Sequence, residues 1–199
     1  PHVVDIVNDG RIHIVEPDLD AFVQSAVSAG RLVASTVSQP GDVYIICVPT
    51  PLHENEGVPQ PNINYVVTAT KSISHFIKPG DLIILESTSP VGTTEQIQHI
   101  LFDEGINIDQ VYIAYCPERV LPGKIMRELV DNDRIVGGVT SEATKAVAKF
   151  YRTFVKGNVP ETDAKTAEMC KLTENSFRDV NIAFANELSL ICDKEGINV

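Results

Sequence analysis

The sequence has few of the features that mark a membrane protein or a nucleic-acid-binding protein. No hydrophobic run approaches the roughly 20 consecutive apolar residues that a helix needs to cross a bilayer. Basic residues are scarce, with 16 Lys and Arg against 27 Asp and Glu, so the formal net charge is −11. We therefore expect neither a membrane nor nucleic acid as a partner, although a local basic pocket for a phosphorylated ligand remains compatible with this charge.

Cysteine and histidine are also sparse, and their spacing does not form the usual metal or redox motifs. The four cysteines lie far apart and include no C-x-x-C pair: Cys47, Cys116, Cys170 and Cys192. The five histidines show no metal-ligand spacing either. We expect reduced thiols in a cytoplasmic protein, and no metal site.

We expect the chain to be a fragment or a processed chain, with one main domain. It begins with Pro1 rather than Met, and the apolar residues at 3, 4, 6 and 7 suggest a helix already under way. At 199 residues and 43% hydrophobic, the chain can bury one core and carry one appended element.

Apolar strands alternate with amphipathic helices through most of the chain. The expected strands are residues 32–36, 43–48, 82–85, 111–115 and 135–136. The expected helices are residues 18–30, 63–77, 93–104 and 141–155, and residues 49–62 are expected to form a loop. Such alternation predicts an α/β fold with a mostly parallel sheet and helices on both of its faces.

The last part of the chain, from about residue 163 to 195, is expected to be one long helix or a broken pair of helices. A helix of that length exceeds the diameter of one domain, at about 1.5 Å per residue. We therefore divide the chain into a domain at 1–160 and a long central helix at 161–199. The helix is expected to bridge to another domain or to form a homodimer surface.

Two polar side chains in this helix are suited to binding an oxyanion. Lys171 and Asn175 are four residues apart, so both project from one helix face. An ammonium group beside a carboxamide can hold an oxygen that gains negative charge, as in alcohol oxidation. On spacing alone, a solvated face with Lys171 paired to Glu168 or Glu174 is the commoner arrangement.

Polar or proline-containing turns follow three of the expected strands, at residues 49–51, 87–88 and 117–119. Each turn alone commonly does no more than end a strand. Ligands of parallel sheets bind beyond the carboxyl ends of the strands. Three such turns on one rim therefore favour a ligand site.

Several strings in the sequence resemble the UDP-glucose/GDP-mannose dehydrogenase family, the nucleotide-sugar 6-dehydrogenases. These strings are VPTP (48–51), ESTSPVGTTE (86–95), YCPERVLPG (115–123), RIVGG (134–138) and AEMCKLTENSFRDVNIAFANELSLIC (167–192). They occur in the family's order. The strings PERVLPG and KLTENSFRDVN resemble the branch of this family that acts on UDP-N-acetyl-D-mannosamine.

The resemblance implies a Rossmann-like fold and a four-electron oxidation. Family members convert the C6 alcohol of a nucleotide sugar to a carboxylate with two NAD and one water, through a cysteine-bound intermediate. Carried over by motif, Lys171 and Asn175 would hold the oxyanions, Thr88 would position the water, and Glu118 would act as general base.

The same resemblance assigns binding roles to six further residues. Those expected to line the NAD cofactor at the strand ends are Pro49, Thr50 and Ser87. Those expected to contact the UDP-sugar substrate are Arg119, Val120 and Leu121.

Some family motifs are not in this sequence. The Gly-rich phosphate loop and the ribose-binding acid belong to a first β-α-β segment that should precede Pro1. The catalytic Gly-Gly-x-Cys string and the nucleotide-sugar domain should follow the last residue. We therefore expect the chain alone to be inactive. Two alternatives stay open: a β-hydroxyacid-type dehydrogenase that stops after two electrons, and a binding or dimerisation module without catalysis.

Overall fold

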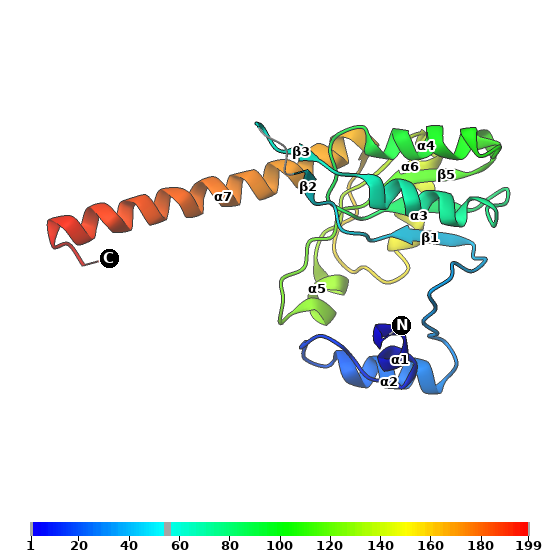
Figure 1. Cartoon of the computed structure of the whole chain (residues 1–199), viewed down its shortest axis with the longest axis horizontal. Coiled ribbons are helices and arrows are strands. Elements are labelled where there is room, and N and C mark those ends of the chain that lie inside the picture. The colour runs from blue at the N-terminus through cyan, green and yellow to red at the C-terminus, as the bar shows by residue number, and fades with distance from the viewer. Residues whose placement is uncertain (1, 54–56, 199) are drawn as a thin grey trace.

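A five-stranded sheet forms the centre of the computed structural model, which describes residues 2–53 and 57–198 (Figure 1). The strands lie in the order β1 (Val43–Ile46), β4 (Leu82–Leu85), β5 (Tyr112–Tyr115), β6 (Val136–Gly138) and β7 (Glu161–Asp163). Strands β1, β4 and β5 are parallel, β6 is antiparallel to β5, and β7 is parallel to β6. The prediction of a mostly parallel sheet is confirmed.

Two helical layers cover the two faces of this sheet. Helices α3 (Asn64–Ser74) and α4 (Thr93–Asp103) pack on one face, and α6 (Ser141–Tyr151) packs on the other. The side chains of β4 alternate between the two cores, because successive residues of a strand point to opposite faces. All four residues of β4 are buried, as expected for a continuous apolar run in a central strand.

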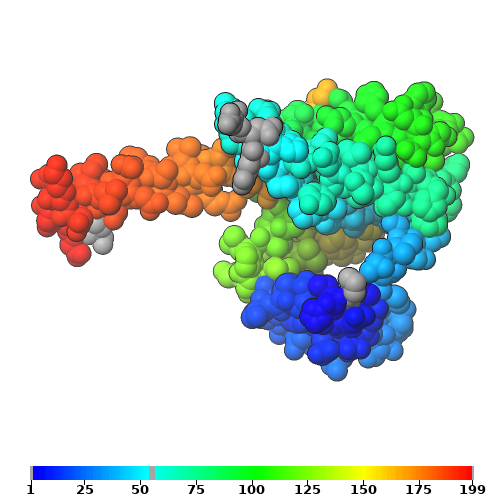
Figure 2. All heavy atoms as spheres, in the orientation of Figure 1, coloured from blue at the N-terminus to red at the C-terminus, as the bar shows by residue number. Residues whose placement is uncertain are grey.

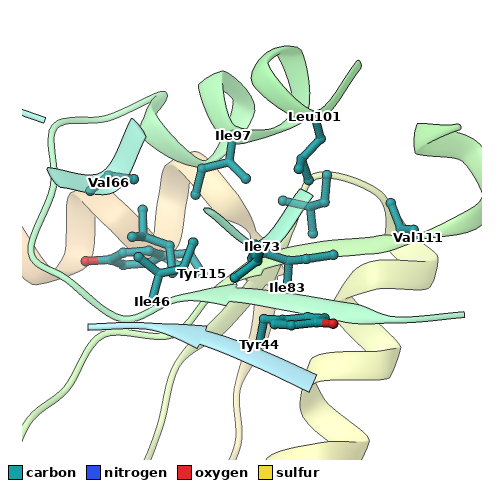
Figure 3. Close-up of a cluster of buried hydrophobic side chains, with 12 residues drawn as sticks. Tyr44, Ile46, Val66, Ile73, Ile83, Ile97, Leu101, Val111 and Tyr115 are labelled. Carbon is teal, nitrogen blue, oxygen red and sulfur yellow. The ribbon is translucent and has the colours of Figure 1, made fainter. Parts of the chain in front are cut away.

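Figure 3 shows the core beneath α3 and α4. Ile83 of β4 and Ile97 and Leu101 of α4 are fully buried there, and Tyr115 of β5 also contributes to this core. The opposite core contains Ile84 of β4 together with residues of α6. These contacts bury the central strands between the two helical layers, and the strands position the turns that follow them.

The N-terminal helices α1 (His2–Asn8) and α2 (Leu19–Ser28) form a pair that lies apart from the helices on the sheet, near the short helix α5 (Ile125–Asp131) (Figure 1). Glu16, which is 6% exposed, connects this pair to the N-terminal end of α5. Its carboxylate accepts hydrogen bonds from the backbone N–H groups of Gly123 at 2.8 Å and Ile125 at 2.7 Å.

The prediction of a strand at residues 32–36 is wrong. Among residues 2–53 and 57–198 this segment has no strand neighbour, and Ala34 instead exchanges two hydrogen bonds with the side chain of Asn8, at 2.8 and 3.0 Å. An apolar, β-prone sequence becomes a strand only beside another strand that completes its ladder.

Three further elements were not predicted from the sequence: α5, β7 and the 3-10 turn η1 (Ile108–Gln110). The expected loop at 49–62 contains two short antiparallel strands, β2 (Leu52–His53) and β3 (Gln60–Pro61).

The C-terminal segment is a single helix, α7 (Ala164–Glu195), rather than a broken pair. Asp163 caps its first turn by accepting a hydrogen bond from Thr166 N at 2.9 Å, and Gly196 ends it in the left-handed conformation with φ 68°. Only its first turns are buried against the body, and the remainder projects outward (Figure 2).

Helix α7 begins tightly against β6 because β6 ends in two glycines. A Cβ on Gly137 would lie 2.2 Å from the backbone oxygen of Asp163, well inside van der Waals contact. The glycine therefore allows the backbone at the junction of β7 and α7 to lie close against β6. Helix α7 then packs against β5 and β6, and Lys171 reaches the loop that follows β5.

Within the described residues, no helix is both long enough and apolar enough to cross a membrane.

Candidate functional site

A cavity of about 260 Å³ lies at the carboxyl ends of β1, β4 and β5. These three strands end level with one another, since Ile46 pairs with Leu85 and Leu85 pairs with Tyr115. The cavity is lined by Cys47, Val48, Glu86, Ser87, Thr88, Glu118 and Lys171. The strand-end turns and α7 thus meet at one site, and Thr88, Glu118 and Lys171, which were predicted to be catalytic, lie together there.

Hydroxyl groups tie the first two turns to each other. Ser87 Oγ accepts a hydrogen bond from Val48 N at 2.7 Å and donates to Val48 O at 2.8 Å. Thr50 Oγ1 donates to the backbone oxygen of Thr88 at 2.6 Å. Of the three residues predicted to bind the cofactor, only Ser87 lines the cavity, while Pro49 and Thr50 lie on the same rim outside its lining.

A second cavity, of about 380 Å³, adjoins the first through Lys171. Its lining combines residues predicted to bind substrate with charged and polar residues of α5 and α7: Arg119, Val120, Leu121, Glu128, Asn132, Lys171, Glu174 and Arg178. Arg119 forms an ion pair with Glu174, and its backbone oxygen accepts a hydrogen bond from Asn132 Nδ2 at 3.2 Å. Glu128 accepts a hydrogen bond from Leu121 N at 2.8 Å. The loop at 119–121 is therefore held from two sides.

Lys171 lies between the two cavities. Its Nζ donates a hydrogen bond to the backbone oxygen of Glu118 at 2.6 Å, and partial burial lowers the pKa of its ammonium group. Among the described residues, Lys171 has no ion pair with Glu168 or Glu174, because Glu168 binds the start of α4 and Glu174 binds Arg119. The solvated-face alternative for Lys171 does not describe this structure.

The side chains of Lys171 and Asn175 do not share a hydrogen-bond partner in this structure. Asn175 lies one turn further along α7, where its Oδ1 accepts a hydrogen bond from Arg178 Nη2 at 2.8 Å, and it lines neither cavity. The Glu118 carboxylate accepts a hydrogen bond from Val120 N in its own loop.

A cluster around Glu86 was not foreseen from the sequence. The Glu86 carboxylate accepts hydrogen bonds from Tyr151 OH and from the Cys47 thiol at 3.2 Å, and it lies 3.6 Å from the buried Arg134 guanidinium. Partial desolvation and the neighbouring Glu86 raise the pKa of Cys47 to about 12, so this thiol is neutral at physiological pH. The sequence signal that could have predicted this cluster is Glu86 itself, a carboxylate that directly follows the fully apolar strand β4.

All four cysteines are free thiols. Burial raises the pKa of Cys116 to about 11, so it too is a neutral thiol rather than a nucleophilic thiolate. The described part of the chain contains no group of three or more His, Cys, Asp and Glu side chains arranged to hold a metal ion.

Comparison with known proteins assigns both parts of the chain. Residues 1–155 match the model of the NAD binding domain of the UDP-glucose/GDP-mannose dehydrogenase family, and residues 165–199 match the model of its central domain. These matches confirm the family indicated by the motifs and the expected cofactor, NAD.

Individual relatives agree with this assignment. The chain is 53% identical to an NDP-N-acetyl-D-galactosaminuronic acid dehydrogenase of Ralstonia nicotianae, with 100% of the chain and 48% of that protein covered. It is 51% identical to the UDP-N-acetyl-D-mannosamine dehydrogenase of Escherichia coli strain K12, with 100% of the chain and 49% of that protein covered.

Among solved structures, the UDP-D-ManNAc dehydrogenase from Pyrococcus horikoshii superposes with a TM-score of 0.91 at 41% identity, covering 99% of this chain and 47% of that one. The chain thus spans about half the length of the relatives that it matches. The sequence motifs, the mostly parallel sheet and both domain models agree: the chain belongs to the UDP-glucose/GDP-mannose dehydrogenase family.

Proposed function

We propose that this chain is part of a cytoplasmic nucleotide-sugar 6-dehydrogenase of polysaccharide biosynthesis. Its substrate would be UDP-N-acetyl-D-mannosamine, oxidised to UDP-N-acetyl-D-mannosaminuronate with two NAD. The observation that carries this proposal is that Lys171 lines both cavities. A reacting carbon held between a cofactor in one cavity and a sugar nucleotide in the other would lie beside its ammonium group.

The smaller cavity fits the nicotinamide end of NAD. It lies at the carboxyl ends of parallel strands, where this cofactor binds in Rossmann-like sheets. Thr88 contributes a hydroxyl group to its lining, and the hydrogen bonds between Ser87 and Val48 hold the adjoining turn in place. NAD, when bound, supplies the hydride acceptor. The larger cavity is lined by three cationic side chains against two glutamates, although Arg119 is paired with Glu174. This excess of positive charge suits an anionic sugar nucleotide.

The remaining chemistry falls to side chains of this chain. Oxidation of the C6 alcohol requires a proton acceptor for the hydroxyl, and we assign that role to Glu118. Lys171 would stabilise the alkoxide and the later tetrahedral oxyanion, with Asn175 as its proposed partner after a side-chain rearrangement. Thr88 would position the hydrolytic water. Pro49, Thr50 and Ser87 would shape the cofactor rim, and Arg119, Val120 and Leu121 would hold the substrate.

The stoichiometry of the full-length protein tests this proposal. We expect two NADH per UDP-N-acetyl-D-mannosamine consumed, with no aldehyde trapped by added hydroxylamine, because a covalently held intermediate cannot escape between the two oxidations. NADH absorbance and chromatography of the sugar nucleotides measure both quantities. One NADH per substrate, with a trapped aldehyde, would instead support the two-electron dehydrogenase alternative. UDP-N-acetyl-D-galactosamine as a parallel substrate tests the sugar assignment, which fails if this epimer has the higher kcat/KM.

We also propose that the protein forms a homodimer through α7. The projecting part of this helix carries large apolar side chains in the open, including Phe177 at 71%, Phe184 at 67% and Leu190 at 66% exposed. Exposed apolar surface of this kind on a projecting helix is typical of a protein–protein interface.

Substitution of Phe184 by Glu tests the dimer in the full-length protein. We expect the dimer to dissociate, because the change removes apolar contact and places two negative charges in the interface. Sedimentation velocity at micromolar concentration measures the result. Lys156→Glu, which changes an exposed charge on the body of the protein, is the control and should leave the dimer intact. An unchanged dimer in Phe184→Glu places the interface elsewhere.

A further inference from the structure

Glu168 is a fully buried carboxylate whose partners lie far away in the sequence. Its side chain is 0% exposed, although it lies on a helix most of whose length is solvent-exposed. Oε2 accepts a hydrogen bond from Gly92 N at 2.6 Å, and Oε1 accepts from Thr94 N at 2.8 Å and from Thr94 Oγ1 at 2.6 Å. A buried charge requires such compensation.

These three donors belong to the start of α4. The first N–H groups of a helix have no partner within the helix, and a negative charge near them is also favoured by the helix dipole. Residue Gly92 at the N-cap of α4 has φ 95° and no side chain to serve as the acceptor. Glu168 of α7 therefore supplies the cap from 74 and 76 residues away.

The cap joins the two segments that carry the proposed catalytic groups. Glu168 precedes Lys171 by three residues, or nearly one turn of α7. Gly92 follows Thr88 by four residues at the end of the same loop. Thr88 and Lys171 both line the smaller cavity. The three hydrogen bonds therefore fix the spacing between the Thr88 loop and the Lys171 helix.

A second connection between the same helices is weaker. Lys165 Nζ lies 2.9 Å from Glu95 Oε1, with side chains 55% and 40% exposed. Exposed ion pairs of this kind contribute little to the stability of a protein. The three buried hydrogen bonds to Glu168 are thus the stronger polar connection between α4 and α7 near the site.

From this geometry we infer that Glu168 is a positioning residue for Lys171 in the reaction that we propose for the full-length enzyme. It does not contact either cavity, and it acts by holding the Lys171 turn of α7 at the correct distance from the Thr88 loop. The inference rests on the proposed function, because Glu168 would act by positioning Lys171 for that reaction.

Glu168→Gln in the full-length enzyme tests this role. Glutamine keeps the shape but presents an NH2 group to donors, so at least one of the three hydrogen bonds is lost. We expect kcat to fall roughly 10- to 100-fold, as for a misplaced catalytic group, with the KM for NAD and sugar nucleotide changed less than about threefold. Glu95→Gln is the matched control, since it breaks only the exposed connection between the same helices, and it should stay within about twofold of wild type.

A double-mutant cycle with Lys171→Met separates positioning from a purely structural role. If Glu168 acts through Lys171, Glu168→Gln should cost little further turnover once Lys171 is replaced. Equal fold-losses in the two backgrounds would overturn the inference. Wild-type turnover in Lys171→Met would instead contradict the proposed function itself, so the two failures are distinct.

Thr94 provides a milder pair of variants in case Glu168→Gln does not fold. Thr94→Val removes one donor to the carboxylate, and Thr94→Ser retains the hydroxyl. We expect a severalfold loss of kcat in the valine variant and restored turnover in the serine variant, at unchanged KM. A valine variant with wild-type kcat, or a serine variant as impaired as the valine one, would count against the inference.

Discussion

Replacement of Lys171 by Met in the full-length enzyme is expected to lower turnover by about 100-fold or more. Methionine keeps an unbranched side chain of similar length and good helix propensity, so α7 should persist. The change removes the positive charge at the junction of the two cavities, where the reacting oxygen would become negative. NADH formation under saturating substrates measures kcat, and we expect smaller changes in the KM for the sugar nucleotide.

The pH dependence of the wild-type enzyme adds a second readout. Because partial burial lowers the pKa of Lys171, its ammonium group deprotonates at a lower pH than an exposed lysine would. Activity that needs the charged form should therefore decline on the alkaline side as pH rises through that lowered pKa. The Lys171→Met variant should lose this alkaline limb.

Lys165→Met is the matched control for this experiment. Lys165 lies on the same helix, but its ammonium group pairs with Glu95 at the surface rather than facing a cavity. Its replacement should leave turnover near the wild-type value. Turnover of Lys171→Met equal to that of the control would remove Lys171 from the catalytic site.

Replacement of Glu118 by Gln is expected to lower turnover by roughly 100- to 10,000-fold, the usual contribution of general acid–base catalysis. Glutamine cannot accept the proton from the C6 hydroxyl. Its amide oxygen can still accept the hydrogen bond from Val120 N, and Lys171 is held by the backbone oxygen of Glu118. The variant therefore removes proton transfer while the loop and Lys171 keep their contacts.

A comparison variant distinguishes the loss of proton transfer from a loss of loop shape. Glu128→Gln is the comparison variant, because Glu128 binds Leu121 N beside the larger cavity, and it should mainly raise the KM for the sugar nucleotide. A Glu118→Gln enzyme with wild-type kcat would show that another group accepts the proton.

Local sequence pattern was sufficient where the physical requirement was itself local. The four apolar residues of β4 predicted a strand buried on both faces, because no other environment suits such a run. The polar turns after β1, β4 and β5 predicted a rim site, because level parallel strands bring their carboxyl ends together. The long strings around Lys171 and Glu118 identified the family.

The sequence failed where an element depends on a distant neighbour. Residues 32–36 have the composition of a strand but lie beside no strand in the part of the chain that the structure describes, and strand pairing is a property of two segments rather than one. Helix α5 was also missed, although the apolar residues at 125, 126, 129 and 130 recur at helical spacing.

The sequence by itself determined the fold class, the family and the residue types available for catalysis, because hydrophobic periodicity and contiguous motifs depend only on residues that are close together in the sequence. Only the tertiary structure decided how those residues are used. It placed Lys171 against the backbone of Glu118, 53 residues away, rather than against a neighbouring acid on its own helix. It also buried Glu16 and Glu168, two acids that the sequence alone would leave in solvent, because backbone N–H groups from remote segments supply the hydrogen bonds that a buried carboxylate needs.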